Sequence, residues 1–322
     1  MKRRDFLKTG AAVAGVGSLG TPAIAQSAAK TLRFVPQANL ANPDPIWTTA
    51  TVAINHGYMV WDTLYGIDNA GVGQPQMLAG HEVSDDKLTW TFTLRDGLLF
   101  HDNAPVRGID CVTSIARWSK RDPFGQQLAL QTNEMKALDD KRFTIRLKRP
   151  FPLMTYALGA DGCFIMPERI SSTDAFKQIS EYVGSGPFKF LKDEWVSGAK
   201  AAWAKFDKYN PRSEKPEFFS GGKHVYVDRV EWQVILDPAT AAAALQSGEV
   251  DWVEWPLIDL LPMLKKAPGV VIAINDPLGV LGMIRFNQLY PPFDNPKLRQ
   301  ALFPAIDRRS SWTRWPASRA IW

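Results

Sequence analysis

The alternation of strand and helix signals between residues 228 and 274 is the feature that most restricts the fold of this chain. Apolar residues at every second position predict a strand, Pro238 opens a helix, and Ser247-Gly248 ends it. The predicted order is strand, helix, strand, helix and strand, over residues 230–234, 238–247, 250–253, 256–266 and 270–274. Helices that separate short strands in this way predict an α/β lobe built in layers.

Two β-hairpins are predicted in the first half of the chain. In residues 88–94 apolar side chains alternate with Thr, and the polar turn 84–87 precedes them. The turn 139–141 precedes a second alternating run, 143–147. Other predicted elements are a strand over 32–35, a helix over 47–64 capped by Thr48 or Thr49, a helix over 109–118, and a turn over 184–187 before a strand at 188–190.

Length and charge limit the kind of protein further. With 322 residues the chain is about twice a typical domain of roughly 150 residues, so we expect two lobes or one large unit. The formal net charge is +5, but residues 1–25 contribute +3 and residues 308–322 contribute +4. The body between them therefore carries −2. This argues against a nucleic-acid partner, because neutralising phosphates requires an excess of Lys and Arg on the folded body.

The N-terminal segment has the order of parts of a twin-arginine export signal. Arg3 and Arg4 lie in a basic stretch, a weakly apolar run follows over 9–20, and Ala23-Ile24-Ala25 provides a cleavage site. We expect cleavage after Ala25 and, because no Cys lies near that position, a periplasmic protein without a lipid anchor. The alternative is a cytosolic chain with a basic amphipathic start, which the glycines of this segment disfavour.

The sequence offers no catalytic or metal-binding constellation. Its four His residues form no HxxxH or HExxH spacing, and the nucleophile-elbow, P-loop and dinucleotide-loop motifs are absent, so we expect neither cofactor nor metal ion. We expect His101, with Asp102 and Asn103, to support a turn rather than bind a ligand. Cys111 and Cys163 are expected to be buried free thiols, with a disulfide as the alternative in an oxidising compartment.

Aromatic density is the remaining pointer to a ligand. Nine of the twelve Trp residues lie between positions 47 and 255, and aromatic rings are common in ligand clefts. Most of these rings are expected to pack in the core. Trp252 and Trp255 follow a short strand of the predicted α/β unit, at the kind of sheet edge where such folds present clefts.

Five sequence blocks resemble, in the same order, those of family 5 of the bacterial extracellular solute-binding proteins. They lie at 79–97, with Ser84-Asp85-Asp86 and Arg95-Asp96-Gly97, at 100–106, with Phe100-His101-Asp102, at 184–188, at 244–251 and at 287–308. The resemblance implies the two-lobed α/β fold of periplasmic binding proteins, known as the Venus flytrap fold. It also implies a monomer that closes on a dipeptide, oligopeptide, nickel complex or similar solute and delivers it to an ABC permease in the inner membrane.

The chain departs from the family pattern after Asp307-Arg308. Members of the family continue for about another 150–200 residues, so we expect the first lobe to be largely present and the second mostly missing. The expected parts are an export signal over 1–25, a first lobe over 26–274 with a subdomain at about 50–180, the start of a second lobe over 275–307 and an aberrant tail over 308–322. A frameshift, a genuine stop and an irregular tail all stay open.

The geometry of the family implies a half-cleft that would touch the solute. Its candidate residues are Trp47, Thr48, Thr49, Thr51, Phe124, Trp252 and Trp255. One alternative is a truncated remnant that does not bind solute, in which an apolar patch near Leu298, Leu302 and Ile306 stays uncovered. A second alternative is an exported enzyme, which needs a convergent nucleophile, base or metal set that the sequence does not offer.

Overall fold

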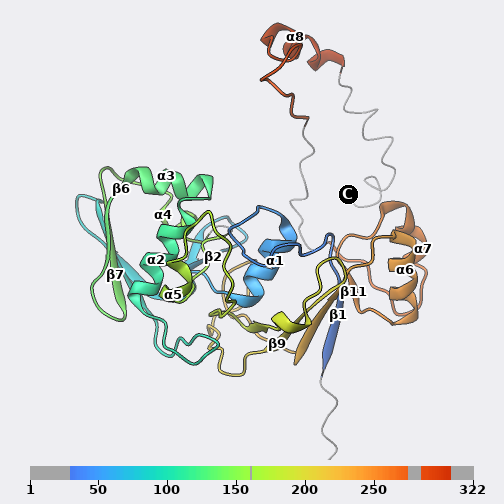
Figure 1. The fold of residues 1–322 in the computed structure, drawn as a ribbon, viewed down its shortest axis with the longest axis horizontal. Helices are drawn as coiled ribbons and strands as arrows, with labels where there is room; N and C mark the ends of the chain where they lie inside the picture. Colours follow the sequence, from blue (N-terminus) through green and yellow to red (C-terminus); the bar gives the residue numbers. More distant parts are fainter. Residues whose placement is uncertain (1–29, 160–161, 275–283, 306–322) are drawn as a thin grey trace, which may run out of the picture.

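The computed structural model describes residues 30–159, 162–274 and 284–305 of the chain. Its largest sheet has five strands in the order β11-β1-β10-β9-β8 (Figure 1). The strands are β1 (Thr31–Val35), β8 (Phe188–Phe190), β9 (Lys200–Lys205), β10 (Arg229–Gln233) and β11 (Trp252–Val253). β1 runs parallel to β10 and β11, whereas β10 with β9 and β9 with β8 pair antiparallel, so the sheet is mixed.

The connection from β10 to β11 is the predicted strand-helix-strand unit. Helix α6 (Pro238–Ser247) begins at Asp237, whose carboxylate accepts a hydrogen bond of 2.7 Å from the backbone N–H of Thr240. The helix ends at Gly248, whose φ of 74° is left-handed. β1 lies between the two strands that α6 joins and pairs with both. This part of the sequence prediction is confirmed.

The remainder of the predicted unit forms only in part. Residues Ile258–Leu260 make the 3-10 helix η2, and Leu261–Leu264 make the short helix α7. Residues 270–274 form no strand, and within the described chain no strand pairs with them. Val271 is 85% exposed. An apolar run becomes a strand only where a neighbour satisfies its backbone N–H and C=O groups, so the prediction of a strand here was wrong.

A four-stranded antiparallel sheet in the order β4-β5-β7-β6 contains both predicted hairpins. Its strands are β4 (Leu78–Val83), β5 (Thr89–Leu94), β6 (Thr132–Ala137) and β7 (Arg142–Leu147). Helices α2 (Gly108–Trp118) and α3 (Pro123–Gln131) lie in the same part of the molecule (Figure 1). Phe92 of β5 and Phe143 of β7 are fully buried and stack with their ring centroids 4.9 Å apart. The alternating residues therefore form the core of this sheet.

Helix α1 (Thr51–Val60) packs in the core of the five-stranded sheet and is shorter than predicted at both ends. Its N-cap is Ala50, without a side-chain cap, and the hydroxyl of Thr48 instead accepts a hydrogen bond from the backbone N–H of Ala50 at 3.2 Å. Capping by Thr48 or Thr49 was therefore wrong. The reason lies just upstream, where the backbone N–H of Trp47 donates to the carbonyl of Asp44 and closes a turn before the helix can begin.

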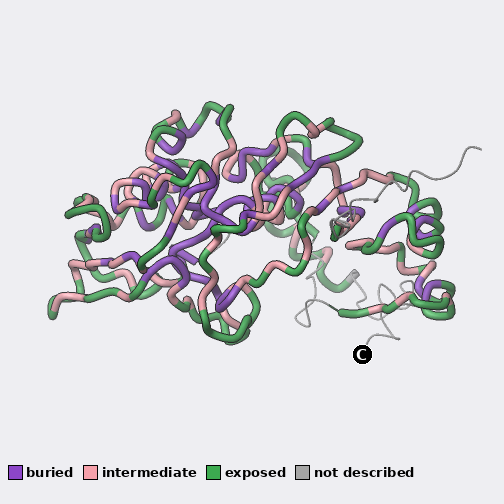
Figure 2. The backbone as a smooth tube through the Cα atoms, turned by 90° about the horizontal axis from the view of Figure 1, so that it is seen from below, coloured by how far each residue is buried: buried purple, intermediate pink, exposed green. Residues whose placement is uncertain are grey.

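Buried hydrophobic residues form one cluster at each sheet and a smaller third cluster between α6 and β1, and several shorter elements surround them. These elements are β2 (Tyr65–Ile67), β3 (Gly73–Pro75), α4 (Met154–Ala157), α5 (Glu168–Ser171) and η1 (Lys192–Glu194). Figure 2 shows the buried residues in the interior and the exposed ones around the rim. Cys111 and Cys163 are buried and free, as predicted. Within the described ranges, no helix combines the length and apolar character needed to cross a membrane.

Residues 284–305 stand apart from the two sheets (Figure 1). They contain α8 (Pro296–Ala301) and the 3-10 helix η3 (Phe303–Ala305). Asn295 caps α8 by accepting a hydrogen bond of 2.9 Å from the backbone N–H of Lys297. No residue of α8 is buried. The predicted export signal with Arg3, Arg4 and Ala25, the tail over 308–322 and Ile306 lie outside the described residues. The division into lobes stays a prediction.

Candidate ligand-binding site

A buried ion pair anchors the loop that precedes α1. The carboxylate of Asp44 is fully buried and accepts two hydrogen bonds from the guanidinium of Arg117 on α2, at 2.7 and 3.2 Å. The same carboxylate accepts hydrogen bonds from the backbone N–H groups of Ile46 and Ile179. Because a buried charge is stable only when it is paired and hydrogen-bonded, this arrangement fixes the loop against the end of α2.

A cavity of about 500 Å³ opens between this loop, the end of α2 and the start of α3. It brings together three of the predicted ligand residues, Trp47, Thr48 and Thr49. The described residues that line it are Pro45, Ile46, Trp47, Thr48, Thr49, Ile54, Trp118, Arg121, Asp122 and Gly162. The wall thus combines aromatic and aliphatic surface with hydroxyl groups and one residue of each charge, a composition that suits a small ligand with polar ends.

Arg121 supplies the positive charge of the cavity. Its guanidinium donates a hydrogen bond of 2.9 Å to the carbonyl oxygen of Trp47 and lies 4.7 Å from the centroid of the Trp47 ring. Among the described residues, no carboxylate lies within ion-pair distance of Arg121. The neighbouring Asp122 instead caps α3, because its carboxylate accepts hydrogen bonds from the backbone N–H groups of Phe124 and Gly125 at 2.8 and 2.9 Å.

Trp118 lies in the wall of the cavity with an unsatisfied donor. The side chain is buried, and its indole N–H has no hydrogen-bond partner in the described part of the chain. A Cβ on Gly162 would lie 3.3 Å from this nitrogen, so a larger residue at 162 would crowd the indole edge. Leaving a buried donor unpaired costs about 1–3 kcal/mol, which makes such a group a candidate for contact with an acceptor on a ligand.

The other predicted ligand residues do not line the cavity. Thr51 is exposed at the first position of α1. Phe124 is half-buried in α3 and contacts the rings of Phe151 and Tyr156. Trp252 and Trp255, at β11, are 48% and 60% exposed. Trp252 packs edge-on against Phe34 of β1, with the ring centroids 5.3 Å apart.

Reasoning from the sequence missed the other lining residues of the cavity, among them Trp118, Arg121 and Gly162. A local signal existed for the second: Asp122-Pro123 is a strong N-cap and first-turn pair, and it marks the start of a helix directly after Arg121. Trp118 ends the predicted helix over 109–118 but gives no sign of its unpaired N–H. No local signal indicates Gly162, because it reaches the cavity only through the tertiary fold.

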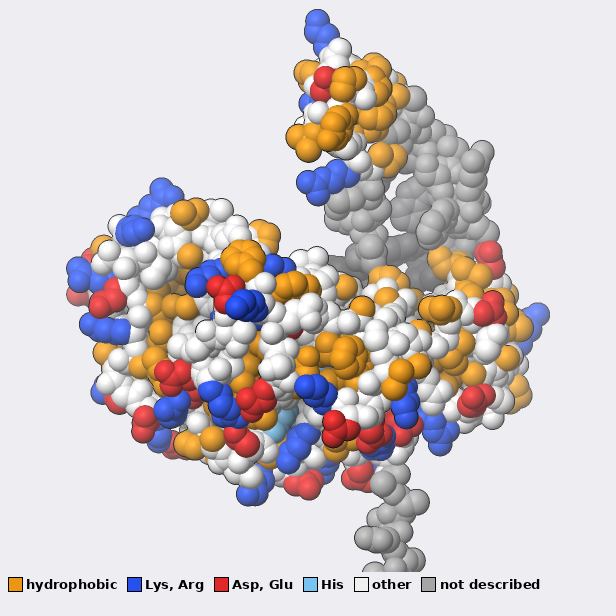
Figure 3. Space-filling model, viewed as in Figure 1, with side chains coloured by type: hydrophobic (Ala, Val, Ile, Leu, Met, Phe, Trp, Pro, Cys, Tyr) orange, Lys and Arg blue, Asp and Glu red, His pale blue; other side chains and the backbone are white. Residues whose placement is uncertain are grey.

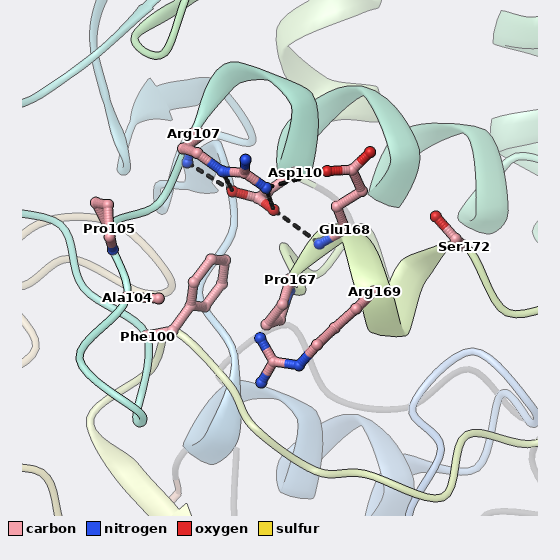
Figure 4. A pocket seen from close by; sticks show the side chains of 9 residues that line it. All are labelled: Phe100, Ala104, Pro105, Arg107, Asp110, Pro167, Glu168, Arg169 and Ser172. Atoms are coloured by element: carbon pink, nitrogen blue, oxygen red, sulfur yellow. Dashed lines mark hydrogen bonds and ion pairs between the residues drawn. The ribbon is translucent and has the colours of Figure 1, made fainter.

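A second cavity, of about 590 Å³, lies between the start of α2 and α5 (Figure 4). Its charged side chains are already paired. The Arg107 guanidinium contacts the carboxylates of Asp110 and Glu168, both at the N-terminal ends of their helices. Arg169 pairs with two further carboxylates. This cavity therefore offers a ligand no uncompensated charge, and the cavity beside Trp47 is the better candidate.

The face shown in Figure 3 and the acidic groups of the described residues give no sign of a phosphate-binding or metal-binding site. Lys and Arg side chains are interspersed with Asp and Glu over the face of the body in Figure 3. Such a face lacks the basic stripe that binds phosphates. Among the residues that the structure describes, no group of three or more His, Cys, Asp and Glu side chains is placed to hold a metal ion.

Comparison with known proteins decides the family. The protein-family model for "bacterial extracellular solute-binding proteins, family 5 middle" matches residues 73–312 of the chain. The family model for the twin-arginine translocation signal matches residues 1–20. The chain belongs to family 5 of the bacterial extracellular solute-binding proteins. The match confirms the resemblance carried by the five sequence blocks. The signal and the family make this family 5 protein a periplasmic one, exported by the twin-arginine route.

Relatives of this family 5 chain extend beyond it. It is 40% identical over 315 residues to a probable peptide ABC transporter periplasmic-binding protein of Sinorhizobium fredii, and the match covers 96% of this chain and 59% of the relative. It is 27% identical over 287 residues to the glutathione-binding protein GsiB of Salmonella typhi, and this match covers 88% of this chain and 53% of GsiB. The chain therefore spans between half and two thirds of the length of these curated relatives.

A solved structure shares the fold. The dipeptide binding protein of a Pseudoalteromonas species, in complex with Met-Leu, is 19% identical to this chain, with a TM-score of 0.69 over 86% of this chain and 57% of that protein. This likeness confirms the predicted fold class, the α/β fold of periplasmic binding proteins.

Proposed function

We propose that this family 5 protein is the solute-binding component of an ABC importer and that the cavity beside Trp47 binds a peptide or a similar small solute. The cavity carries the proposal, because an aromatic ring, two hydroxyl groups and a cation without an ion-pair partner among the described residues line it together. No set of nucleophile and base accompanies them in that lining, so the proposed action is binding without turnover. The proposed partner is the permease of the inner membrane, and the proposed state is a monomer.

The relatives support a peptide-like solute. One is named for peptides and is 40% identical to this chain, and another is named for glutathione, which is a tripeptide. A cavity of about 500 Å³ lies within the 300–1,000 Å³ range of small-molecule sites. A peptide of two or three residues offers both the apolar side chains and the charged ends that this lining suits.

Four of the candidate residues are proposed at the border of the site. Thr51 follows the cavity residue Thr49 by two positions, and Phe124 follows Asp122 by two. Trp252 and Trp255 flank Glu254, whose carboxylate accepts a hydrogen bond of 2.7 Å from the Asn55 side chain of α1. This bond joins the edge of the five-stranded sheet to the helix that begins at the cavity.

The proposed mode of binding is closure of two lobes on the solute. In this proposal the first lobe comprises residues 26–274, with a subdomain at about 50–180, and the second begins within 275–307. The cavity then forms one wall of the cleft, and closure about a hinge between the lobes completes the other.

Binding of defined peptides to the purified chain tests the proposal. We would titrate the chain with Met-Leu and with glutathione, use maltose as a control of similar size, and follow binding by calorimetry and by ligand-observed NMR, which detects millimolar affinities. We expect saturable binding of at least one peptide, no binding of maltose and no change in the peptide during incubation. Binding of neither peptide, or the appearance of a hydrolysis product, would contradict the proposal.

A further inference from the structure

On the basis of the function proposed above, we infer that the cavity beside Trp47 receives a carboxylate of the solute and that Arg121 binds it. The guanidinium of Arg121 is half-buried and is held in place by its hydrogen bond of 2.9 Å to the carbonyl oxygen of Trp47. The guanidinium carbon of Arg121 also lies 4.7 Å from the centroid of the Trp47 ring and 5.4 Å from that of the Phe176 ring, and these two rings further restrict the orientation of the guanidinium. A cation held in one orientation loses little entropy when it binds an anion.

The positive charge of Arg121 is available to a ligand. Within the described part of the chain, ion pairs occupy Arg107, Arg117, Arg169 and Arg229, whereas none involves Arg121. The acidic residue beside it does not compensate it, because one oxygen of Asp122 accepts both hydrogen bonds at the N-terminus of α3. The positive end of the dipole of α3 stabilises that carboxylate.

Two further features of the wall favour an acceptor group. The buried indole N–H of Trp118 has no hydrogen-bond partner among the described residues, and Gly162, which has no side chain, lies beside this edge of the ring. Helix α1 begins between the lining residues Thr49 and Ile54, and its N-cap, Ala50, provides no side-chain acceptor for the first turn. A guanidinium, an unpaired indole N–H, two threonine hydroxyls and an uncapped helix N-terminus together form a donor-rich site.

A carboxylate matches this set better than a neutral carbonyl group does. Its two oxygens can accept parallel hydrogen bonds from a guanidinium, which a single carbonyl oxygen cannot, and charged hydrogen bonds are roughly twice as strong as neutral ones. In a peptide, the C-terminal carboxylate is the group that every sequence provides. The inference therefore predicts a preference for free peptide acids over their amides, independent of the side chains of the peptide.

The experiment compares Met-Leu with its C-terminal amide on the wild-type chain and on three variants. Arg121→Gln removes the cation, and Arg121→Lys keeps the charge without the planar fork. The matched control is Lys120→Gln, because Lys120 is the exposed neighbour and its replacement changes the net charge equally. Far-UV circular dichroism and thermal unfolding verify that each variant is folded.

We expect the wild-type chain and Lys120→Gln to bind the acid about tenfold more tightly than the amide, which is the effect of one charge-assisted hydrogen bond. Arg121→Gln is expected to lose this preference and Arg121→Lys to keep part of it. If the wild type binds acid and amide equally, or if Arg121→Gln retains the preference, the inference is wrong while the proposed function stands. If the wild type binds neither form of Met-Leu and does not bind glutathione, the inference about Arg121 and the proposed function are both wrong.

Discussion

The imidazole of His101, in the loop after β5, forms a hydrogen bond with Gly186, in the glycine turn before β8. Its Nε2 donates to the carbonyl oxygen of Gly186 at 3.0 Å, and its Nδ1 accepts from the backbone N–H of Gly184 at 3.1 Å. Both bonds require the neutral ring with its proton on Nε2. Burial lowers the pKa of His101 to about 4, which favours the same form. The structural role predicted for this histidine is confirmed.

Acid should therefore destabilise the protein through His101. Because its pKa is about 4 in the folded chain and 6.5 when unfolded, the stabilisation is complete above pH 6.5 and is lost as the pH falls from 6.5 to about 4. The shift corresponds to about 3 kcal/mol. Urea unfolding of the wild type and of His101→Gln across this pH range measures it.

The variant should show a weaker dependence of the unfolding free energy on pH. Burial also lowers the pKa of His56, to about 3, so part of the dependence remains in His101→Gln. His224→Gln, at an exposed position, is the control and should keep the wild-type slope. Equal slopes for His101→Gln and the wild type would show that His101 titrates normally.

Breaking the ion pair of Asp44 should cost far more than breaking an exposed pair. Arg117→Met leaves the buried carboxylate of Asp44 without its partner, and we expect a loss of about 3–5 kcal/mol in the free energy of unfolding. The control is Arg142→Gln, which removes an exposed pair with Asp139 and should cost less than about 1 kcal/mol. Urea unfolding at pH 7 measures the free energy of unfolding of both variants. Similar losses for Arg117→Met and Arg142→Gln would contradict the stabilising role assigned to the buried ion pair.

The end of α6 offers a test of backbone conformation. Gly248→Ala places a Cβ on a residue with φ of 74°, and we expect a loss of about 1 kcal/mol, although no neighbouring atom obstructs the Cβ. Gly80→Ala is the matched control, because space is equally open there and the φ is not left-handed. The control should be neutral or slightly stabilising. Equal effects in thermal unfolding would rule out left-handed strain as the cause.

The sequence was informative where a structure is decided by neighbours along the chain. Alternation predicted the hairpin strands that bring Phe92 onto Phe143, and Pro238 and Ser247-Gly248 predicted the two ends of α6. It failed over 270–274, where the apolar residues are present but no described strand pairs with them. Strand formation depends on that distant partner, which local composition does not reveal.

The sequence predicted only the part of the candidate site that lies on the loop before α1. The segment with Trp47, Thr48 and Thr49 was found through the family resemblance, whereas Arg121 was not, because it meets Trp47 across 74 residues of sequence. In the sequence, an arginine between two helices cannot be distinguished from any other surface charge; only the fold shows that no described carboxylate pairs with it. The unpaired N–H of Trp118 is likewise a property of packing, since every buried tryptophan has the same sequence signal.

Substitution of Trp47 should reveal how much its ring contributes to binding. Trp47→Ala removes the cavity wall and the support of Arg121, so we expect peptide affinity to fall at least about tenfold. Trp255→Ala, at the border of the proposed site, should have a smaller effect in the same calorimetric titration. A larger loss for Trp255→Ala would move the site to the edge of β11.

The most direct test of the central claim is to follow the indole N–H signals of the twelve tryptophans by ¹⁵N–¹H NMR while Met-Leu is added. Trp47→Phe, Trp118→Phe and Trp90→Phe variants assign the signals that matter. Trp90 is the control, because its indole N–H is also buried and has no hydrogen-bond partner among the described residues, but it lies on β5, outside the cavity. We predict saturable shifts for Trp47 and Trp118 and none for Trp90. Shifts confined to other tryptophans, or no shifts at any concentration of the peptide, would contradict the assignment of the cavity as the binding site.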